Sequence, residues 1–510
     1  MPAHRFHGGL QLEKHTTGVL ARPIQIAAPS VVLALALQQH RGLRLSASVR
    51  VGESVAAGQV LARPDLDIGD PRWGAWLHAP CAGEVIGIET RPLIQQPTQS
   101  GLHILLRVDG IDSVQAAPFD WQNMTREAVQ ACLARAGISG LGGANFPSAD
   151  KLRVAVETLI LNGAECEPWI GCDDGLLIEE SADVLLGAQI LARASGALRI
   201  DIALEAHMTR ALAALQAALD EVPMPDAVPM RLHRLPSRYP QGGERQLIEV
   251  LTGLQVPLGQ HPSDIGVLVH NVGTAHATAC AAQGRALTHR IVTVTGPGVH
   301  APGNFRVALG TSVADLVAQA GGYTARARRL LIGGPLMGIA LPHDDFALQK
   351  GSNCVLVLDG VRDLVAEPSH ACIRCGDCAE VCPARLSPQL LWQSTQAQRL
   401  DQARENGLMA CIECGLCDLV CPSHIGLTQS FREEKQALWL ADHRARQADD
   451  ARQRFEQRAL RLQREAAALE ARRASAGKEA LSASVVALAI AKAKARRIAR
   501  PGEDGGESAP

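Results

Sequence analysis

Two consecutive copies of the pattern C-x-x-C-x-x-C-x-x-x-C-P constrain this chain more than any other feature. The first copy begins at Cys372 and reads C-I-R-C-G-D-C-A-E-V-C-P, and the second begins at Cys411 and reads C-I-E-C-G-L-C-D-L-V-C-P. In this pattern three thiolates hold one face of an iron-sulfur cube, and the fourth cysteine, followed by proline, ligates the neighbouring cluster. The two copies therefore predict two [4Fe-4S] clusters whose ligands are crossed between the motifs.

The crossed pattern assigns four cysteines to each cluster. One set is Cys372, Cys375, Cys378 and Cys421, and the other is Cys411, Cys414, Cys417 and Cys382. Structural zinc is the alternative, because repeated C-x-x-C pairs also bind zinc through four thiolates. A zinc site does not require the third evenly spaced cysteine or the fourth cysteine before proline, so the pattern favours iron-sulfur clusters.

Length and composition limit the number of domains, the cellular compartment and the classes of partner that this chain can have. A chain of 510 residues is long enough for about three or four domains. Eight of the 14 cysteines lie in the motifs and the others show no disulfide-like pattern, which indicates a reducing compartment. The start shows no secretory signal, and the apolar tract near Ile24 to Leu37 is too short to cross a bilayer. Aromatic residues make up only 3%, so nucleic-acid binding has little support.

Short apolar pairs separated by glycine turns run through residues 40 to 110, as in V-R-V-G-E-S-V-A-A-G-Q-V-L-A-R. This pattern predicts a small sandwich of short strands. It resembles the barrel-sandwich hybrid of biotinyl and lipoyl domains, which carry a lysine on a hairpin turn for cofactor attachment. The matching region from Pro64 to Trp76 has no lysine, so we expect an unmodified structural or docking module.

The pattern then changes to alternating strands and helices. Apolar runs of strand length cover residues 158 to 165, 199 to 206 and 264 to 272, with helical patterns at 176 to 194 and 208 to 219 between them. This alternation favours a mostly parallel sheet, which binds its ligands beyond the carboxyl ends of the strands.

Three polar loops occupy such positions. The first is S-G-L-G-G-A-N-F-P-S-A-D-K, the second N-G-A-E-C-E-P from Asn162, and the third R-Y-P-Q-G-G-E-R-Q-L from Arg238. The glycines of the first loop would let backbone N–H groups approach a phosphate, and its Lys151 would supply a charge. Taken singly, the first loop is more often a simple turn and the second is more often a solvated acidic loop. The alternative for the third loop is a helix N-terminus with Glu244 in its first turn.

Together with the cysteines, the loops give a resemblance to the C subunit of the Rnf electron transport complex, also called Rsx. The similar stretches include H-G-G-L-Q-L-E-K-H, G-L-G-G-A-N-F-P, L-I-L-N-G-A-E-C-E-P-W-I, Y-P-Q-G-G-E-R-Q-L-I and G-G-P-L-M-G, in the family's order. The α/β part is more distantly similar to the NADH-oxidising flavoprotein subunit of respiratory complex I. The resemblance implies FMN and NADH in one pocket, with electrons passing to the clusters.

The resemblance also assigns residues. Cofactor binding falls on Gly140, Gly142, Gly143, Lys151, Asn162, Tyr239, Gly243, Asn271 and Thr274. Glu165, Glu167 and Glu244 are the expected catalytic residues, with positioning of the nicotinamide favoured over proton transfer. The chain departs from the complex I motifs at Leu141, Ala164 and Arg245, where that family has Arg, Asp and Glu. These departures concern NADH contacts more than FMN binding.

The expected fold class is therefore a multidomain α/β protein with five parts. They are an N-terminal region with a barrel-sandwich hybrid (1–120), a Rossmann-like FMN/NADH domain (121–286), a β-grasp domain (287–366), a helical two-cluster ferredoxin domain (367–430) and an Ala/Arg-rich helical tail (431–510). The β-grasp is similar to the soluble-ligand-binding domain of complex I, and a short helix is expected in it from Val313. Leucines among helix formers from Leu386 to Ala410 predict the helical character of the ferredoxin domain. The tail carries 17 Lys and Arg against 9 Asp and Glu between Phe431 and Arg500. It has few turn residues until Ala476, which predicts a long exposed helix to that point.

By this resemblance, we expect an electron-input subunit of the membrane-associated Rnf complex that serves ion-translocating NADH:ferredoxin electron transport. The implied partners are other Rnf subunits, including integral membrane subunits and a ferredoxin-like subunit, with ferredoxin as a partner of the whole complex. The implied location is peripheral, on the cytoplasmic side of the bacterial inner membrane. Two alternatives stay open: a non-enzymatic electron wire and scaffold with a vestigial flavin site, and a soluble flavin and iron-sulfur NADH dehydrogenase module.

Overall fold

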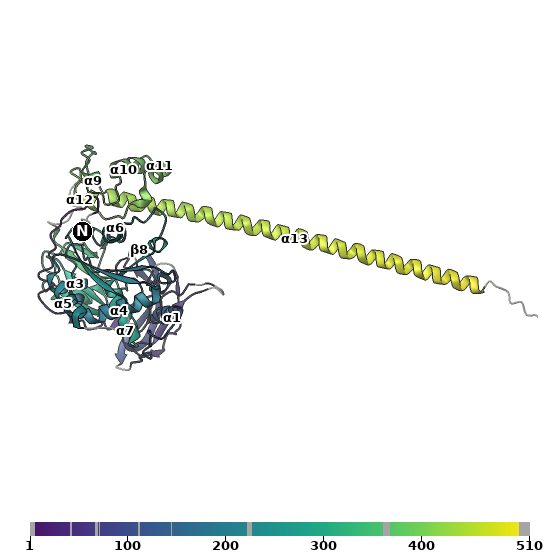
Figure 1. Cartoon of the computed structure of the whole chain (residues 1–510), viewed down its shortest axis with the longest axis horizontal. Helices are drawn as coiled ribbons and strands as arrows, with labels where there is room; N and C mark the ends of the chain where they lie inside the picture. The colour runs from purple at the N-terminus through teal and green to yellow at the C-terminus, as the bar shows by residue number, and fades with distance from the viewer. Residues whose placement is uncertain are drawn as a thin grey trace, which may run out of the picture. The chain divides into compact units, whose positions relative to one another are not determined.

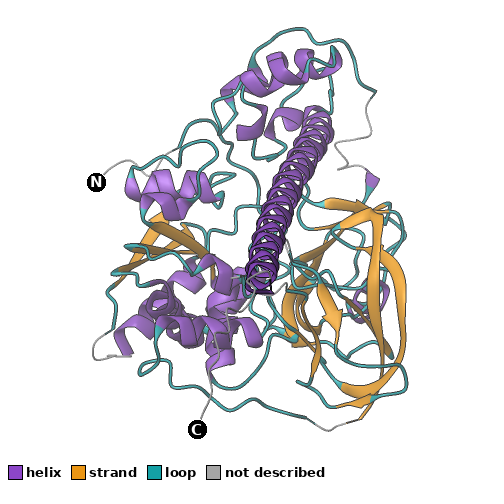
Figure 2. Cartoon of the chain, turned by 90° about the vertical axis from the view of Figure 1, so that its right-hand side faces the viewer, coloured by secondary structure: helices purple, strands orange, loops and turns teal. Residues whose placement is uncertain are grey.

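The computed structural model describes residues 6–40, 43–66, 70, 72–110, 113–143, 145–221, 227–360 and 368–498. By contacts between residues, the chain forms two compact units, Met1–Glu433 and Glu434–Pro510. All described strands belong to the first unit, and the described part of the second unit is helical. Figure 1 labels the main elements, and Figure 2 separates helices from strands.

The first sheets form a barrel-like sandwich over residues 32–110, here called the barrel. One sheet has the order β2 (Val32–Ala36), β8 (Gln96–Gly110), β7 (Ala82–Leu93), β4 (Ser54–Val55), and the other β3 (Leu45–Ala47), β5 (Val60–Pro64), β6 (Leu77–His78). Leu33, Leu35, Leu61 and Ile104 are fully buried between them. The predicted sandwich is present, but the prediction of short strands alone is wrong, because β7 and β8 form a hairpin of 12 and 15 residues. Shifts of register near Gly83 and Gly87 let this long hairpin bend.

The segment before the barrel packs on later parts of the chain. Strand β1 (Gln25–Ile26) pairs in parallel with β14 (Gly303–Ala308), and Phe6 packs in a core with Ile160 and Leu247. Only part of the predicted 1–120 region therefore lies in the barrel.

The α/β domain spans residues 126–282. Its sheet has the order β11 (Met230–Leu235), β10 (Arg199–Glu205), β9 (Thr158–Asn162), β12 (Val267–Asn271), and every pair is parallel, as the alternation predicts. Its helices are α1 (Arg126–Arg135), α2 (Ser148–Lys151), α3 (Cys172–Glu179), α4 (Ser181–Ser195), α5 (Thr209–Glu221), α6 (Glu244–Thr252) and α7 (Val272–Ala282), with a 3₁₀ turn η1 (Pro262–Ile265). The sequence prediction did not include the half-exposed edge strand β11 and joined α3 to α4 across Glu180.

A second sheet domain spans residues 289–358. Its sheet has the order β1, β14, β13 (His289–Thr295), β17 (Cys354–Leu358), β15 (Arg329–Ile332), β16 (Ile339–Leu341). Helix α8 (Val313–Gln319) starts at the predicted residue, and the Ser312 hydroxyl caps it by accepting from the Asp315 N–H at 3.1 Å.

The cysteine domain spans residues 368–431 and contains, among its described residues, helices and loops but no strand. Its elements are α9 (Asp377–Glu380), α10 (Pro388–Gln396), α11 (Leu400–Glu405), η3 (Leu408–Ala410), α12 (Leu416–Leu419) and the start of α13 (Leu427–Ile498). The helical character predicted for Leu386 to Ala410 is confirmed.

Helix α13 continues well past Ala476, where the sequence pattern had placed its end. Among the described helices it alone has an 18-residue window, with a mean hydropathy of 1.3, that is long and apolar enough to cross a membrane. Length and composition by themselves are weak evidence for a span.

Candidate functional site

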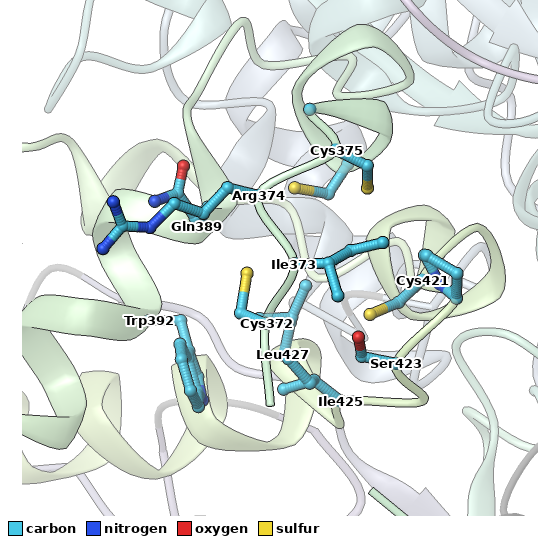
Figure 3. A pocket seen from close by; sticks show the side chains of 13 residues that line it. Cys372, Ile373, Arg374, Cys375, Gln389, Trp392, Cys421, Ser423, Ile425 and Leu427 are labelled. Atoms are coloured by element: carbon cyan, nitrogen blue, oxygen red, sulfur yellow. The ribbon is translucent and has the colours of Figure 1, made fainter. Parts of the chain in front are cut away.

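The eight motif cysteines surround two separate cavities. The Cys372 cavity has a volume of about 20 Å³ and is lined by Cys372, Cys375, Cys378 and Cys421. The Cys382 cavity has the same volume, about 20 Å³, and is lined by Cys382, Cys411, Cys414 and Cys417. Each cavity takes three cysteines from one motif and the fourth from the other, which is the grouping that the crossed pattern predicts. Figure 3 shows Cys372, Cys375 and Cys421 around the first cavity, with Trp392 in its wall.

The two motifs follow the same backbone path. Arg374 and Glu413 occupy matching positions with φ of 59° and 58°, and Gly376 and Gly415 follow with φ of 94° and 75°. The left-handed residues turn each loop so that its first three thiols face one space. Four thiols around one cavity are the donor set of a [4Fe-4S] cluster, so the residues present fit that group.

Only the Cys382 cavity is tied by described hydrogen bonds to the α/β domain and the N-terminal segment. The Tyr239 hydroxyl donates to the Cys414 carbonyl at 2.7 Å, and His7 Nδ1 donates to the Cys382 carbonyl at 3.0 Å. The Gly9 N–H donates to the carbonyl of Val381 at 2.9 Å. Burial raises the pKa of the Cys414 thiol to about 12. At the Cys372 cavity, by contrast, Cys375 is exposed and Ile373 is 68% exposed.

Residues 139–143 of the first predicted loop, here called the glycine loop, lie at the carboxyl ends of β9 and β12. The Leu141 N–H donates to the Thr274 hydroxyl at 2.9 Å, and the Gly140 N–H donates to the Phe146 carbonyl at 2.7 Å. A Cβ added to Gly142 would lie 3.0 Å from the Asn271 Cβ, whereas a Cβ added to Gly143 would meet nothing within 4 Å. The loop backbone therefore packs directly on the start of α7 and has an open side at Gly143, as a phosphate cradle requires.

Lys151 and Glu244, predicted from separate loops, form an ion pair. The Lys151 Nζ lies 2.9 Å from Glu244 Oε1 and also donates to the Val269 carbonyl at 2.7 Å. Lys151 ends α2, and Glu244 begins α6 right after Gly243. Lys151 is therefore paired with a carboxylate in this structure, and its contact with a flavin phosphate stays a prediction.

Asn162 and Asn271 face each other at the ends of neighbouring strands. Asn162 Nδ2 donates to the Gly242 carbonyl at 2.8 Å, which joins the second loop to the third. Asn271 Nδ2 donates to Asp173 Oδ2 at 2.5 Å, and Asn271 Oδ1 accepts from the Gly273 N–H at 2.8 Å. The three loops predicted as separate motifs therefore meet at one edge of the sheet.

Glu165 lies at the start of α3. Its carboxylate accepts from the N–H groups of Asp173 and Asp174, both at 3.1 Å, and from the Cys172 thiol at 3.3 Å. Burial, and then the charge of Asp173, raises the pKa of Glu165 to about 8, while burial also raises the pKa of Asp173. At neutral pH this carboxyl group is therefore able to hold a proton.

Glu167 links the α/β domain to the second sheet domain. Its Oε1 accepts from the N–H groups of Leu336 and Met337 at 2.8 and 2.9 Å, and burial raises its pKa. A Cβ on Gly334 would lie 1.8 Å from the Glu167 Cγ, so the G-G-P-L-M-G turn fits closely around this side chain. The structure thus gives Glu167 backbone partners across a domain boundary, and its contact with nicotinamide stays a prediction.

Tyr239, expected at the flavin, is only 1% exposed and reaches the cysteine domain. The N-terminal stretch H-G-G-L-Q-L-E-K-H also has a role that sequence reasoning did not assign. Gly8 fits so closely against the Cys382 loop that an added Cβ would lie 2.6 Å from the Val381 carbonyl oxygen. Lys14 pairs with Glu205 at 2.5 Å and donates to the Cys166 carbonyl at 2.8 Å. The paired glycines and the lysine of this stretch were the sequence features that could have indicated this role.

Comparison with protein families matches four models to the chain in order. They are the RnfC barrel sandwich hybrid domain over residues 4–110, the Nuo51 FMN-binding domain over 133–279, the SLBB domain over 291–340 and the 4Fe-4S dicluster domain over 371–425. These matches and the two cysteine cavities define the class: a multidomain electron-transport protein with an FMN-binding domain and an iron-sulfur domain.

Curated relatives identify the family. Three proteins, each named as the C subunit of an ion-translocating oxidoreductase complex, are similar over most of the chain. The one from Pectobacterium carotovorum is 39% identical over 96% of the chain, that from Pseudomonas aeruginosa 41% over 91%, and that from Pectobacterium atrosepticum 38% over 97%. The chain belongs to this family, the C subunits of the Rnf complex. It spans 65%, 59% and 71% of the length of these three relatives.

Among solved structures, the chain is similar to an NAD⁺-reducing [NiFe]-hydrogenase in the H₂-reduced state. The match covers 62% of this chain and 63% of the hydrogenase chain, with 22% sequence identity and a TM-score of 0.44.

Proposed function

We propose that this chain is the electron-input subunit of a membrane-associated Rnf complex, moving electrons between NADH, FMN and two [4Fe-4S] clusters. In this proposal the complex carries out ion-translocating NADH:ferredoxin electron transport. The naming of the relatives as C subunits of an ion-translocating oxidoreductase complex supports the general class. The observation that carries the finer proposal is the direct contact of the α/β domain with the Cys382 cavity through Tyr239 and Cys414.

In the proposed site, the glycine loop and Lys151 hold the FMN phosphate. Asn162, Asn271 and Thr274 fix the loop against the strand ends, and Glu244 orients Lys151. When bound, the flavin exchanges a hydride with NADH and the clusters carry single electrons. Glu165 holds a proton at neutral pH at the same edge of the sheet, and Glu167 positions the turn at Leu336.

The contacts between domains also suggest the order in which electrons pass through the two clusters. Val381, Cys382 and Cys414 accept hydrogen bonds from Gly9, His7 and Tyr239, and all three belong to loops that form the Cys382 cavity. We therefore place the Cys382 cluster nearer the flavin and the Cys372 cluster nearer the next electron carrier, for which the exposed Cys375 offers an accessible edge.

The flavin assignment is tested by cofactor content. Gly142→Ala puts a Cβ 3.0 Å from Asn271, and Lys151→Glu places a negative charge beside a phosphate dianion. Lys151→Glu should lower bound FMN at least about tenfold, since a charged hydrogen bond contributes about 1.5–3 kcal/mol. Gly142→Ala should lower bound FMN because the loop backbone must shift away from Asn271. Both variants should leave iron content unchanged. Gly18→Ala, whose Cβ meets only Pro302 at 3.5 Å, is the matched control for the glycine change.

Unchanged FMN in both variants would rule out the glycine loop as the phosphate site. A wild-type chain that holds both clusters but neither binds FMN nor oxidises NADH would favour the electron-wire alternative instead.

For location, we propose attachment to the cytoplasmic face of the bacterial inner membrane through integral Rnf subunits. The basic residues Lys492, Lys494, Arg496 and Arg497 in the last turns of α13 would assist weakly, by about 1 kcal/mol each at an anionic surface. Deletion of the residues after Ala476 should leave recovery with partner-containing membranes and NADH oxidation nearly intact. Firm, salt-resistant binding of the isolated chain to lipid vesicles would instead make the apolar window of α13 the anchor.

A further inference from the structure

A third cavity of about 270 Å³ lies where the barrel, the α/β domain and the second sheet domain meet. Its lining comes from α3, α7, the segment 284–291, Arg306 and turns of the barrel near Ala57 and Pro80. Leu141, Asp173 and Gly273 belong to this wall, whereas the predicted flavin ligands Gly142 and Lys151 do not. The cavity therefore shares part of its wall with the glycine loop but does not include these two predicted flavin ligands.

Positive charge dominates this wall. Arg285, Arg290 and Arg306 line it together with His276, and Asp173 is the one carboxylate among the described lining residues. Although burial opposes it, hydrogen bonds with Cys280 and Glu180 raise the pKa of His276 to about 9, so the ring is protonated at neutral pH. Glu180 forms ion pairs with both His276 and Arg306. The remaining positive charge lies on Arg285 and Arg290, and the buried side chains of Cys172, Asp173 and Glu165 act on Arg290.

Arg290 is the most unusual of these side chains. It is only 6% exposed, and its Nε has no hydrogen-bond partner among the described residues. One of its terminal nitrogens donates to the Lys350 carbonyl. A buried guanidinium with an unused donor is costly unless an acceptor completes it, and a carboxylate or phosphate oxygen is the strongest such acceptor. Arg285, by contrast, is exposed, and its guanidinium donates to Gln283 Oε1 at 2.5 Å.

Another part of the wall is apolar. Leu176, Ala277, Leu287 and Ile291 line the cavity beside the charged group. Ligand sites commonly combine such an apolar surface with a few convergent polar groups.

We propose that this cavity binds a small organic anion, with its carboxylate or phosphate at Arg285 and Arg290 and an apolar body against Leu176 and Ala277. The proposal requires neither NADH nor electron transfer, so its test is independent of the proposed function.

The test uses matched probes and ligand-observed NMR on the full chain with its cofactors. Benzoate and phenyl phosphate carry the same ring with two different anionic groups, and benzylamine carries the ring with a positive charge. We expect at least one of the two anions to bind at least about tenfold more tightly than benzylamine, because a charge-assisted hydrogen bond is worth about 1.5–3 kcal/mol. The stronger of the two anions identifies the ligand as a carboxylate or a phosphate.

Two variants localise the binding. Arg285→Glu reverses an exposed charge at the cavity and should weaken the anion at least about fivefold, whereas Arg231→Glu, an exposed arginine on β11 outside the cavity, should not. Ala277→Leu fills the cavity and should abolish binding of the ring. Equal binding of benzoate, phenyl phosphate and benzylamine would overturn the proposal, and so would anion binding that Arg285→Glu leaves unchanged. Because Arg285 is exposed, this second criterion holds even if Ala277→Leu fails to fold.

Discussion

The Cys372 and Cys382 cavities are built from one repeated motif but have different surroundings. Their loops share the positive φ angles at Arg374 and Glu413 and the same number of thiols. Cys375 is nevertheless exposed, whereas Cys414 is 7% exposed and its carbonyl accepts from Tyr239. The repeat specifies how a cluster is held, and residues far from the repeat specify which cluster lies beside the α/β domain.

The largest expected effect comes from removing the cysteine that each motif lends to the other. Cys382→Ser should remove the cluster of the Cys382 cavity, although Cys382 belongs to the first motif. Iron should fall from about eight to about four atoms per chain, since each cluster holds four. Iron analysis and EPR measure this change.

Cys421→Ser is the matched partner, because it should remove the cluster of the Cys372 cavity and keep the other. Loss of the Cys372 cluster in the Cys382→Ser variant would contradict the crossed assignment.

Gly8→Ala should disturb the Cys382 cavity alone. The added Cβ would lie 2.6 Å from the Val381 oxygen and 2.8 Å from the Cys382 carbonyl carbon, so the cysteine loop must move. Gly52→Ala is the control, since Gly52 also has a positive φ, of 86°, but faces open space. Both changes carry about 1–2 kcal/mol of backbone strain, and only Gly8→Ala should alter the EPR signal of the Cys382 cluster. Equal spectra for the two variants would show that the N-terminal contact is not needed.

Tyr239→Phe should have a smaller effect on the same cavity. It removes the hydrogen bond to the Cys414 carbonyl and keeps the packed ring, which should lower stability by about 1 kcal/mol. Electron transfer to the Cys382 cluster should slow while iron content stays constant. Stopped-flow absorbance measures the rate. An unchanged rate would show that the Tyr239 hydroxyl does not contribute to electron transfer from the α/β domain to the Cys382 cluster.

Glu165→Gln should leave both cavities unchanged and alter only the pH dependence of stability. Because the folded pKa of Glu165, about 8, lies above its unfolded value near 4.5, the folded chain binds more protons between these values. Stability should therefore fall as pH rises from about 5 to 8, and the Gln variant should show a smaller fall. Chemical denaturation at pH 5 and pH 8 checks this, and an identical fall in both proteins would contradict a raised pKa.

The sequence predicts features that depend on local spacing. The cysteine spacing gives the grouping around both cavities, and the alternation of apolar runs gives the parallel sheet of β9, β10 and β12. Both signals repeat along the chain with the period of the structure that they form.

Contacts between domains have no such period. The bond of Tyr239 to Cys414, the fit of Gly8 against Val381 and the engagement of Glu167 by Leu336 each join residues more than a hundred positions apart. The edge strand β11 was missed for a related reason: its Arg231, His233 and Arg234 give it a polar pattern, since only part of it is buried.

The most direct test of the proposed order of the clusters compares their reduction by NADH in the two cysteine variants, followed by EPR of rapidly frozen samples. We expect NADH to reduce the remaining Cys382 cluster in Cys421→Ser at the wild-type rate. In Cys382→Ser the remaining Cys372 cluster should stay oxidised with NADH and become reduced only with dithionite. Reduction of the Cys372 cluster by NADH in Cys382→Ser, at the wild-type rate, would contradict the account.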